Sequence, residues 1–140
     1  MLPTTEDLQA GRTLAEIQGM TAELGAAIAE LAAAEAAAGS LDAARELLEG
    51  LLVSNPRDAL SWALLAQVER WRGDAATGLL CAEAARCLAP DDAQVRLARA
   101  EVLLALGGAG DEARAELEAL RGEAGEVGRR AASLLLAMGA

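Results

Sequence analysis

The chain has 140 residues and a formal charge of −10, with 22 acidic residues against 12 basic ones. A chain this acidic is not expected to present the basic patch that binding to nucleic acid or to an anionic membrane surface requires. We therefore expect neither as a partner. All 12 cationic residues are arginine and histidine is absent, which removes Schiff-base lysines, P-loops and histidine-based catalysis. We therefore expect no enzyme activity and no cofactor, because no pair of buried carboxylates stands out as a general acid and base.

The composition predicts an all-α fold, because alanine and leucine are abundant while β-branched and aromatic residues are few. A chain of this length buries enough surface to fold without a disulfide or a metal, so we expect one domain over residues 1–140. Cys81 and Cys87 are six residues apart on a predicted helix and point in different directions. We expect free thiols there, with no disulfide and no metal site.

The first predicted element is an N-terminal helix over residues 6–24. The residues before it lack the positive region and apolar run of a signal peptide, so we expect a cytoplasmic protein. No apolar stretch reaches the ~20 residues of a membrane helix, so we expect no membrane insertion. The apolar residues of the N-terminal helix predict either a homodimer contact or packing onto the next element; they are Leu8, Leu14, Ile17 and Met20.

Three helical hairpins follow, at residues 25–58, 59–92 and 93–125, because the sequence repeats at an interval of 34 residues. This interval aligns three glycines, three alanines and two prolines: Gly39, Gly73 and Gly107; Ala32, Ala66 and Ala100; Pro56 and Pro90. Each glycine tolerates the left-handed conformation that ends a helix, so each is expected to end the first helix of a hairpin.

Polar residues beside these glycines and prolines predict where the next helices begin. Ser40 and Asp74 directly follow a glycine and are good N-caps for the second helix of a hairpin. Each proline ends that second helix, and Asp58 or Asp91 is expected to start the following hairpin.

The last hairpin has one extra residue in its loop, the segment GGAGDEA, before Ala113, Leu117 and Leu120 resume the repeat. A capping helix over residues 126–140 is expected to cover the apolar end of the stack. Its apolar run consists of Leu134, Leu135, Leu136 and Met138.

The middle hairpin carries a known set of spaced residues: Trp62, Leu65, Ala66, Gly73, Ala85 and Pro90. In this order and spacing they resemble the tetratricopeptide repeat. Glu69 and Gly78 depart from that signature. The resemblance covers roughly residues 25–125 and implies a superhelix of three repeats with an N-terminal helix and a C-terminal capping helix.

The resemblance also implies a protein-binding groove, lined by one face of the first helix in each hairpin. In the second and third hairpins we predict the binding residues to be Leu60, Ala63, Gln67, Arg70, Trp71, Gln94, Leu97, Glu101 and Leu104. In the first hairpin the same face holds small side chains only, namely Ala26, Ala29, Ala33 and Ala36. The lysine and asparagine with which related domains bind a C-terminal carboxylate are therefore absent from this face.

The two tryptophans are nine residues apart on one predicted helix, so their side chains point in opposite directions. Trp62 is expected to pack inside its own hairpin. Trp71 is expected either in the groove or packed between adjacent repeats.

Within the family, the chain resembles the small type III secretion chaperones that bind translocator subunits. The run Ala100, Glu101, Val102, Leu103 and Gly107 is similar to a run in their third repeat. This resemblance implies a chaperone whose groove holds an extended apolar segment of a secreted substrate. The alternative is a scaffold or adaptor that joins proteins in a bacterial assembly, and the residues alone do not separate the two.

Overall fold

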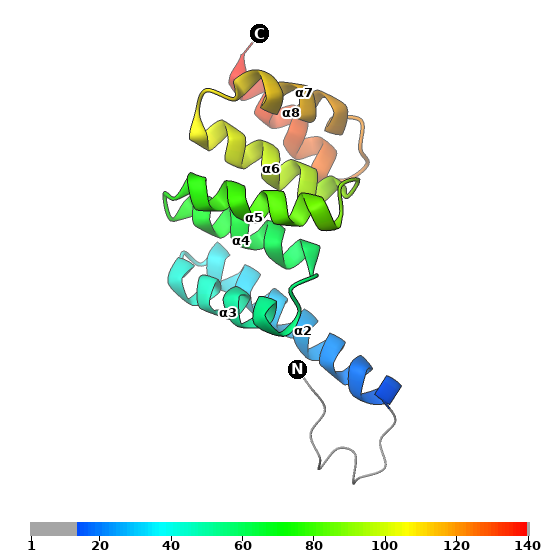
Figure 1. The fold of residues 1–140 in the computed structure, drawn as a ribbon. Coiled ribbons are helices and arrows are strands. Elements are labelled where there is room, and N and C mark those ends of the chain that lie inside the picture. Colours follow the sequence, from blue (N-terminus) through cyan, green and yellow to red (C-terminus); the bar gives the residue numbers. More distant parts are fainter. Residues whose placement is uncertain (1–13, 140) are drawn as a thin grey trace. The chain divides into compact units, whose positions relative to one another are not determined.

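The computed structural model describes the backbone of residues 14–139 and the side chains of residues 21–139. These residues fold entirely into helices and loops, which confirms the all-α expectation. The helices in chain order (Figure 1) are α2 (Leu14–Ala37), α3 (Leu41–Ser54), α4 (Ala59–Trp71), α5 (Ala75–Leu88), α6 (Ala93–Leu106), α7 (Gly110–Leu120) and α8 (Glu126–Met138).

The chain divides into two compact units, Met1–Pro56 and Arg57–Ala140, here called unit 1 and unit 2. The length had predicted a single domain. The boundary lies in the loop between α3 and α4, at the first of the two repeated prolines. Proline disfavours helical conformation in the residue before it, so helix α3 ends at Ser54, Asn55 is not helical, and the chain turns at Pro56 and Arg57.

Unit 1 is a hairpin in which α2 packs against α3. Helix α2 is one uninterrupted helix of 24 residues, so the predicted break near residue 25 is absent. A single glycine costs a helix interior only about 1 kcal/mol, and Gly25 has no capping residue after it to end the helix. An added Cβ at Gly25 would lie 3.8 Å from Leu51, an ordinary contact. The predicted helix residues 6–13 lie outside the described part of the chain.

Glycines form the turns inside the hairpins, as the repeat predicted. Gly39 and Gly73 have φ angles of 87° and 89°, in the left-handed region that favours glycine. After each glycine the next amide donates to a carbonyl five residues back, from Ser40 to Glu35 and from Asp74 to Glu69, both at 2.8 Å. These bonds satisfy carbonyls at the helix end in a Schellman motif.

The third turn differs from the other two, as the extra loop residue predicted, because α7 begins three residues after Gly107, whereas α3 and α5 begin two residues after Gly39 and Gly73. Gly107 and Gly108 have φ angles of 72° and 75°, and helix α7 begins at Gly110. Ala113, Leu117 and Leu120 are buried behind this loop, so the repeat resumes where the sequence indicated.

Aspartates cap α4, α5 and α6 of unit 2. The carboxylate of Asp58 accepts from the Ser61 amide at 3.2 Å, and that of Asp74 accepts from the Thr77 amide at 3.1 Å. Asp92, not the predicted Asp91, caps α6, accepting from the amides of Gln94 and Val95 at 2.9 and 3.1 Å. Asp92 directly precedes the first helical residue, so its short side chain reaches these amides.

Trp62 packs in the core of unit 2, as predicted. It lies partly buried against a cluster of four buried residues from α4, α5 and α6, which are Ala63, Ala85, Val95 and Ala98. The tryptophan therefore joins its own hairpin to the first helix of the next one.

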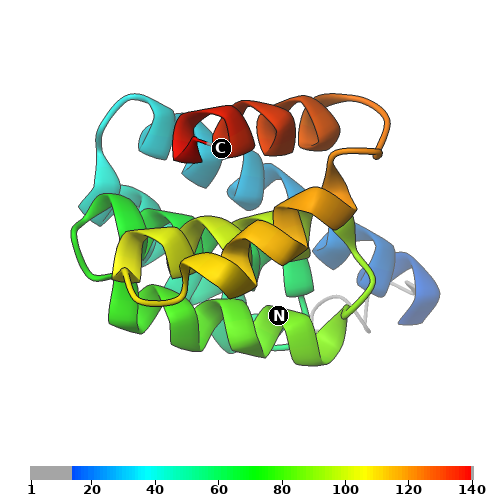
Figure 2. The same cartoon turned by 90° about the horizontal axis from the view of Figure 1, so that it is seen from above.

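Helix α8 covers the apolar side of α6 and α7 (Figures 1 and 2). Its residues Ala131 and Leu135 share a buried cluster with Ala100, Leu117 and Leu120. Leu134 and Met138 pack against the same cluster. Leu136 is 84% exposed, so one leucine of the predicted apolar run faces away from the core.

Gly78 allows close packing of α5 against α4. A Cβ added there would lie 2.9 Å from the backbone oxygen of Ala66, which is closer than real side chains tolerate. This distance explains why Gly78 departs from the repeat signature at this position. In the next turn of the same helix, Cys81 is buried, whereas Cys87 is exposed, and neither forms a disulfide.

Among residues 14–139, none of the helices has the length and the apolar character needed to span a bilayer.

Candidate functional site

The predicted binding residues lie on α4 and α6, and the structure separates them into three groups. Leu60 and Trp71 are 49% and 47% exposed, and Gln94 is also exposed. Gln67, Arg70 and Glu101 form a polar network. Ala63, Leu97 and Leu104 pack against apolar clusters.

Two exposed residues and one half-buried residue of the predicted site lie on one face of α4. Gln67 and Trp71 follow Leu60 by seven and eleven residues, which places all three within about 40° of one another around the helix. These three residues are called the α4 stripe below. Its two large apolar side chains are each about half exposed, so the stripe presents apolar surface to solvent.

Arg70 lies against the ring of Trp71. Its guanidinium carbon is 5.3 Å from the ring centroid, within the range of a cation–π contact. The contact fixes one side of the tryptophan while nearly half of the side chain stays accessible.

Glu101 is the centre of the polar network. Its side chain is 7% exposed and accepts hydrogen bonds from Gln67 Nε2, from Arg70 Nη2 at 3.5 Å and from Arg130 Nε at 2.6 Å. Arg70 Nε also donates to Gln67 Oε1 at 2.7 Å. A buried carboxylate is costly unless it is paired, and here two arginines and an amide satisfy it.

Two arginines, Arg70 and Arg130, share the single carboxylate of Glu101 in this network. The pKa of Arg70 lies below its ordinary value, mainly because burial disfavours the charged guanidinium. Attraction to Glu101 opposes this shift, and repulsion from Arg130 adds to it. Two cations thus share one carboxylate beside the α4 stripe.

Arg130 is a residue that the sequence analysis missed. It comes from α8, which lies outside the 34-residue repeat, so no repeat position pointed to it. Arginine at the exposed surface of a capping helix is common. Only the folded chain shows that it reaches Glu101 on α6.

Three predicted groove residues do not line an open surface. Ala63 is buried in the cluster beneath Trp62. Leu97 and Leu104 pack against the cluster that contains Ala131 and Leu135 of α8. The repeat pattern treats this face of α6 as free, but the capping helix covers it.

The alanine face predicted in the first hairpin lies on α2 of unit 1. Ala26 and Ala33 are exposed and Ala29 is partly exposed, while Ala36 is buried. This face offers small side chains and no polar group.

Among the side chains of residues 21–139, no group of three or more cysteine, aspartate or glutamate residues is arranged to hold a metal ion.

In a comparison with protein families, residues 25–68 match the tetratricopeptide repeat. The match begins at Gly25, where the first predicted hairpin begins, and runs through α3 into α4. Comparison with curated proteins finds no match. Tetratricopeptide repeats generally mediate protein–protein interaction through extended binding surfaces. Residues 25–68 are therefore similar to a tetratricopeptide repeat and lie within an all-α fold of helical hairpins, which supports a protein-binding module.

Proposed function

We propose that unit 2 binds a protein partner through the α4 stripe, Leu60, Gln67 and Trp71. The observation that carries this proposal is the exposure of Trp71 and Leu60 on the same helix face. Tryptophan is enriched among residues that dominate binding energy, and clustered apolar exposure marks interaction surfaces. Trp71 is the aromatic side chain of the chain that remains half accessible.

The chemistry around the stripe favours an extended segment with apolar side chains. Leu60 and Trp71 would bury such side chains, while Gln67 and the exposed Gln94 supply hydrogen-bonding groups for a peptide backbone. Gln67 and Arg70 are already held by Glu101, so their positions are fixed before a partner arrives. Arg70 in turn supports the ring of Trp71.

We further propose that the chain is a cytoplasmic type III secretion chaperone that keeps an apolar segment of a secreted substrate from aggregating. Its support is the tetratricopeptide match, the charge of −10 and the run from Ala100 to Gly107. The second candidate is a scaffold that joins proteins in a bacterial assembly, which the same exposed stripe would serve.

One experiment separates these two functions. The tagged chain is used to capture partners from its native host, and the dominant partner is then expressed with and without the chain. A chaperone predicts a partner that is insoluble alone and soluble in the complex. A partner that is equally soluble alone would reject the chaperone and leave the scaffold.

The N-terminal part of α2 is proposed as a homodimer contact. Leu14, Ile17 and Met20 lie in α2, and Leu8 lies outside the described residues. Light scattering of the wild type and of an Ile17→Asp variant tests this contact. A dimer that becomes monomeric supports it, and a wild-type monomer rejects it.

A further inference from the structure

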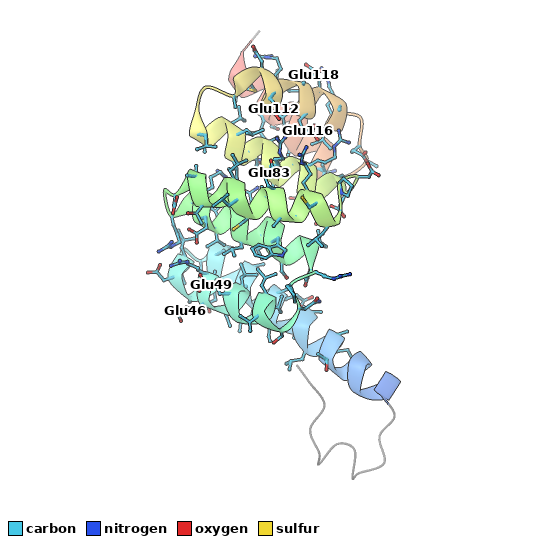
Figure 3. The ribbon with its side chains drawn as sticks, viewed as in Figure 1. Glu46, Glu49, Glu83, Glu112, Glu116 and Glu118 are labelled. Atoms are coloured by element: carbon cyan, nitrogen blue, oxygen red, sulfur yellow. The ribbon has the colours of Figure 1, made fainter. Side chains whose placement is uncertain are left out.

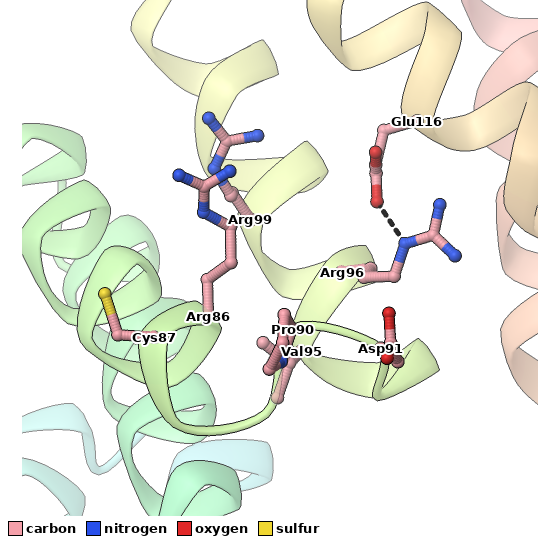
Figure 4. Close-up of a pocket in the computed structure, with 8 residues that line it drawn as sticks. All are labelled: Arg86, Cys87, Pro90, Asp91, Val95, Arg96, Arg99 and Glu116. Atoms are coloured by element: carbon pink, nitrogen blue, oxygen red, sulfur yellow. Dashed lines mark hydrogen bonds and ion pairs between the residues drawn. The ribbon is translucent and has the colours of Figure 1, made fainter.

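A cavity of about 590 Å³ lies in unit 2 between α5, α6 and α7, away from the α4 stripe. Figure 4 shows its lining, which comes from the end of α5, the following loop, α6 and α7. The eight lining residues are Arg86, Cys87, Pro90, Asp91, Val95, Arg96, Arg99 and Glu116. Three of them are arginines and two are acidic residues, so guanidinium groups outnumber carboxylates in the lining itself.

Carboxylates on α5 and α7 hold these arginines in place. Arg96 Nε donates to Glu116 Oε1 at 2.5 Å, and Arg99 Nε donates to Glu83 Oε1 at 2.5 Å. Arg99 Nη2 also donates to Glu112 Oε1 at 2.7 Å. The three glutamates, labelled in Figure 3, therefore fix Arg96 and Arg99 from both neighbouring helices.

The side chain of Arg86 lies beside that of Arg99, because both donate hydrogen bonds to the Glu83 carboxylate. Its Nε donates to Glu83 Oε2 at 3.1 Å, while Arg99 uses Oε1 of the same side chain. Two guanidinium groups therefore converge on one carboxylate. Arg99 is 13% exposed and Arg96 is 29% exposed, so both are largely held within the structure.

These contacts occupy only part of each guanidinium. Arg86 and Arg96 each use Nε, and Arg99 uses Nε and Nη2. Among the described residues, no protein group accepts from the terminal nitrogens of Arg86 and Arg96 or from Nη1 of Arg99. Five terminal nitrogens thus remain as donors at the edge of a cavity that solvent can fill.

Arg99 stays positively charged in this setting. Burial alone would lower its pKa, but hydrogen bonds and charge attraction from Glu83 and Glu112 outweigh burial and raise the pKa above the ordinary value. The carboxylates therefore orient the arginines and preserve their charge.

We propose that this cavity binds an oxyanion, a carboxylate or phosphate group that accepts hydrogen bonds from the terminal nitrogens of Arg96, Arg99 and Arg86. The planar guanidinium presents paired N–H groups that match the oxygens of either group. The volume is within the range of small-ligand sites. Asp91 and Glu116 also line the cavity and repel an anion, which limits the affinity and makes Glu116 a test of the site.

The test uses the full-length protein labelled with ¹⁵N, and follows the arginine Nε–Hε and backbone amide signals at constant ionic strength. Two probes are titrated separately, inorganic phosphate and acetyl-Glu-Glu-amide. We expect saturable shifts at Arg96 and Arg99 with at least one probe. The probe that binds more tightly identifies phosphate or carboxylate as the source of the oxyanion.

Three variants distinguish a binding site from a purely structural ion-pair cluster. Arg96→Gln removes two of the terminal nitrogens and should weaken binding about tenfold, the size of a lost charge-assisted hydrogen bond. Glu116→Gln breaks the same ion pair but removes a competing negative charge, so it should strengthen binding severalfold. Arg121→Gln is the matched control, because Arg121 pairs with Glu118 on α7 and is not part of the lining.

The absence of saturable shifts with both probes in the wild type would overturn the proposal. A Glu116→Gln variant that weakens binding as Arg96→Gln does would also overturn it. If the Arg96–Glu116 ion pair had only a structural role, removing either partner would have the same effect on the probe's affinity. Circular dichroism of each variant verifies that helix content is retained. The result is independent of the α4 stripe, which lies on other residues.

Discussion

Unit 1 and unit 2 are both built from helical hairpins with the same glycine turn, but their helices begin and pair differently. In unit 2, Asp58, Asp74 and Asp92 each accept a backbone hydrogen bond at the start of α4, α5 and α6, while α7 and α8 start without a side-chain cap bond. In unit 1, Ser40 occupies the same place before α3 without a side-chain cap bond. The repeat therefore fixes where the turns occur, while the residue at the cap decides how firmly the next helix is started.

The two units also differ in where their ion pairs lie, within one helix or between helices. Arg45 and Glu49 of unit 1 pair within α3, four residues apart and both at least 41% exposed. In unit 2, Arg70 and Arg130 reach Glu101 from neighbouring helices, and this carboxylate is almost fully buried. Exposed pairs within a helix contribute little, whereas breaking a buried pair is costly. Polar contacts in unit 2 therefore specify how its helices pack.

The largest expected effect of a substitution is at Trp62. Trp62→Ala should lower the free energy of unfolding of unit 2 by about 3 kcal/mol, because it empties the space against Ala63, Ala85, Val95 and Ala98. Urea denaturation followed by circular dichroism measures this loss. A loss below about 1 kcal/mol would contradict the core placement of Trp62.

Two glycine-to-alanine changes sharpen the comparison between the units. Gly78→Ala in α5 should destabilise the chain by about 1 kcal/mol, because its Cβ meets the Ala66 backbone oxygen at 2.9 Å. Gly50→Ala in α3 is the matched control, because nothing lies within 4 Å of its Cβ. It should stabilise by about 0.5 kcal/mol through lower unfolded-state entropy. Equal shifts in melting temperature for both variants would show that α4 and α5 are not closely packed at Gly78.

A smaller difference is expected between the helix caps. Asp92→Ala removes a carboxylate that accepts from two amides and should cost about 1 kcal/mol. Ser40→Ala removes a hydroxyl that makes no cap bond and should cost less than about 0.5 kcal/mol. Chemical denaturation of both variants checks the order, and a larger loss for Ser40→Ala would reverse the comparison.

The turns, the core tryptophan and the capping helix could be predicted because they follow local rules. Glycine at the helix end, proline after the second helix and the spacing of Trp62 all act through neighbours in sequence or through the repeat. The N-cap of α6 was misassigned by one residue, to Asp91 instead of Asp92, although the 34-residue interval from Asp58 leads to Asp92. The sequence predicted that one helix ends and another begins near Gly25, but α2 continues through it. One glycine is too weak a signal to end a helix of this composition.

The candidate site was predicted less completely. Leu60 and Trp71 are exposed as a binding face requires, but Leu104 packs against the cluster that α8 completes. A charged residue at Leu104 would therefore disrupt packing instead of testing binding. The role of Arg130 could not be predicted either, because α8 does not repeat and its contact with Glu101 is set by tertiary packing.

The most direct test of the central proposal compares two exposed apolar side chains on different helices of unit 2. Trp71 belongs to the α4 stripe, and Leu80 lies on α5 and is 73% exposed. Immobilised wild type, Trp71→Ala and Leu80→Ala are used to capture partners from the native host, with quantitative mass spectrometry of the bound proteins. The proposal predicts a specific partner that is retained by Leu80→Ala and reduced at least about tenfold by Trp71→Ala, as expected for a binding hot spot. Undiminished capture by Trp71→Ala, with all three proteins equally helical by circular dichroism, would contradict it.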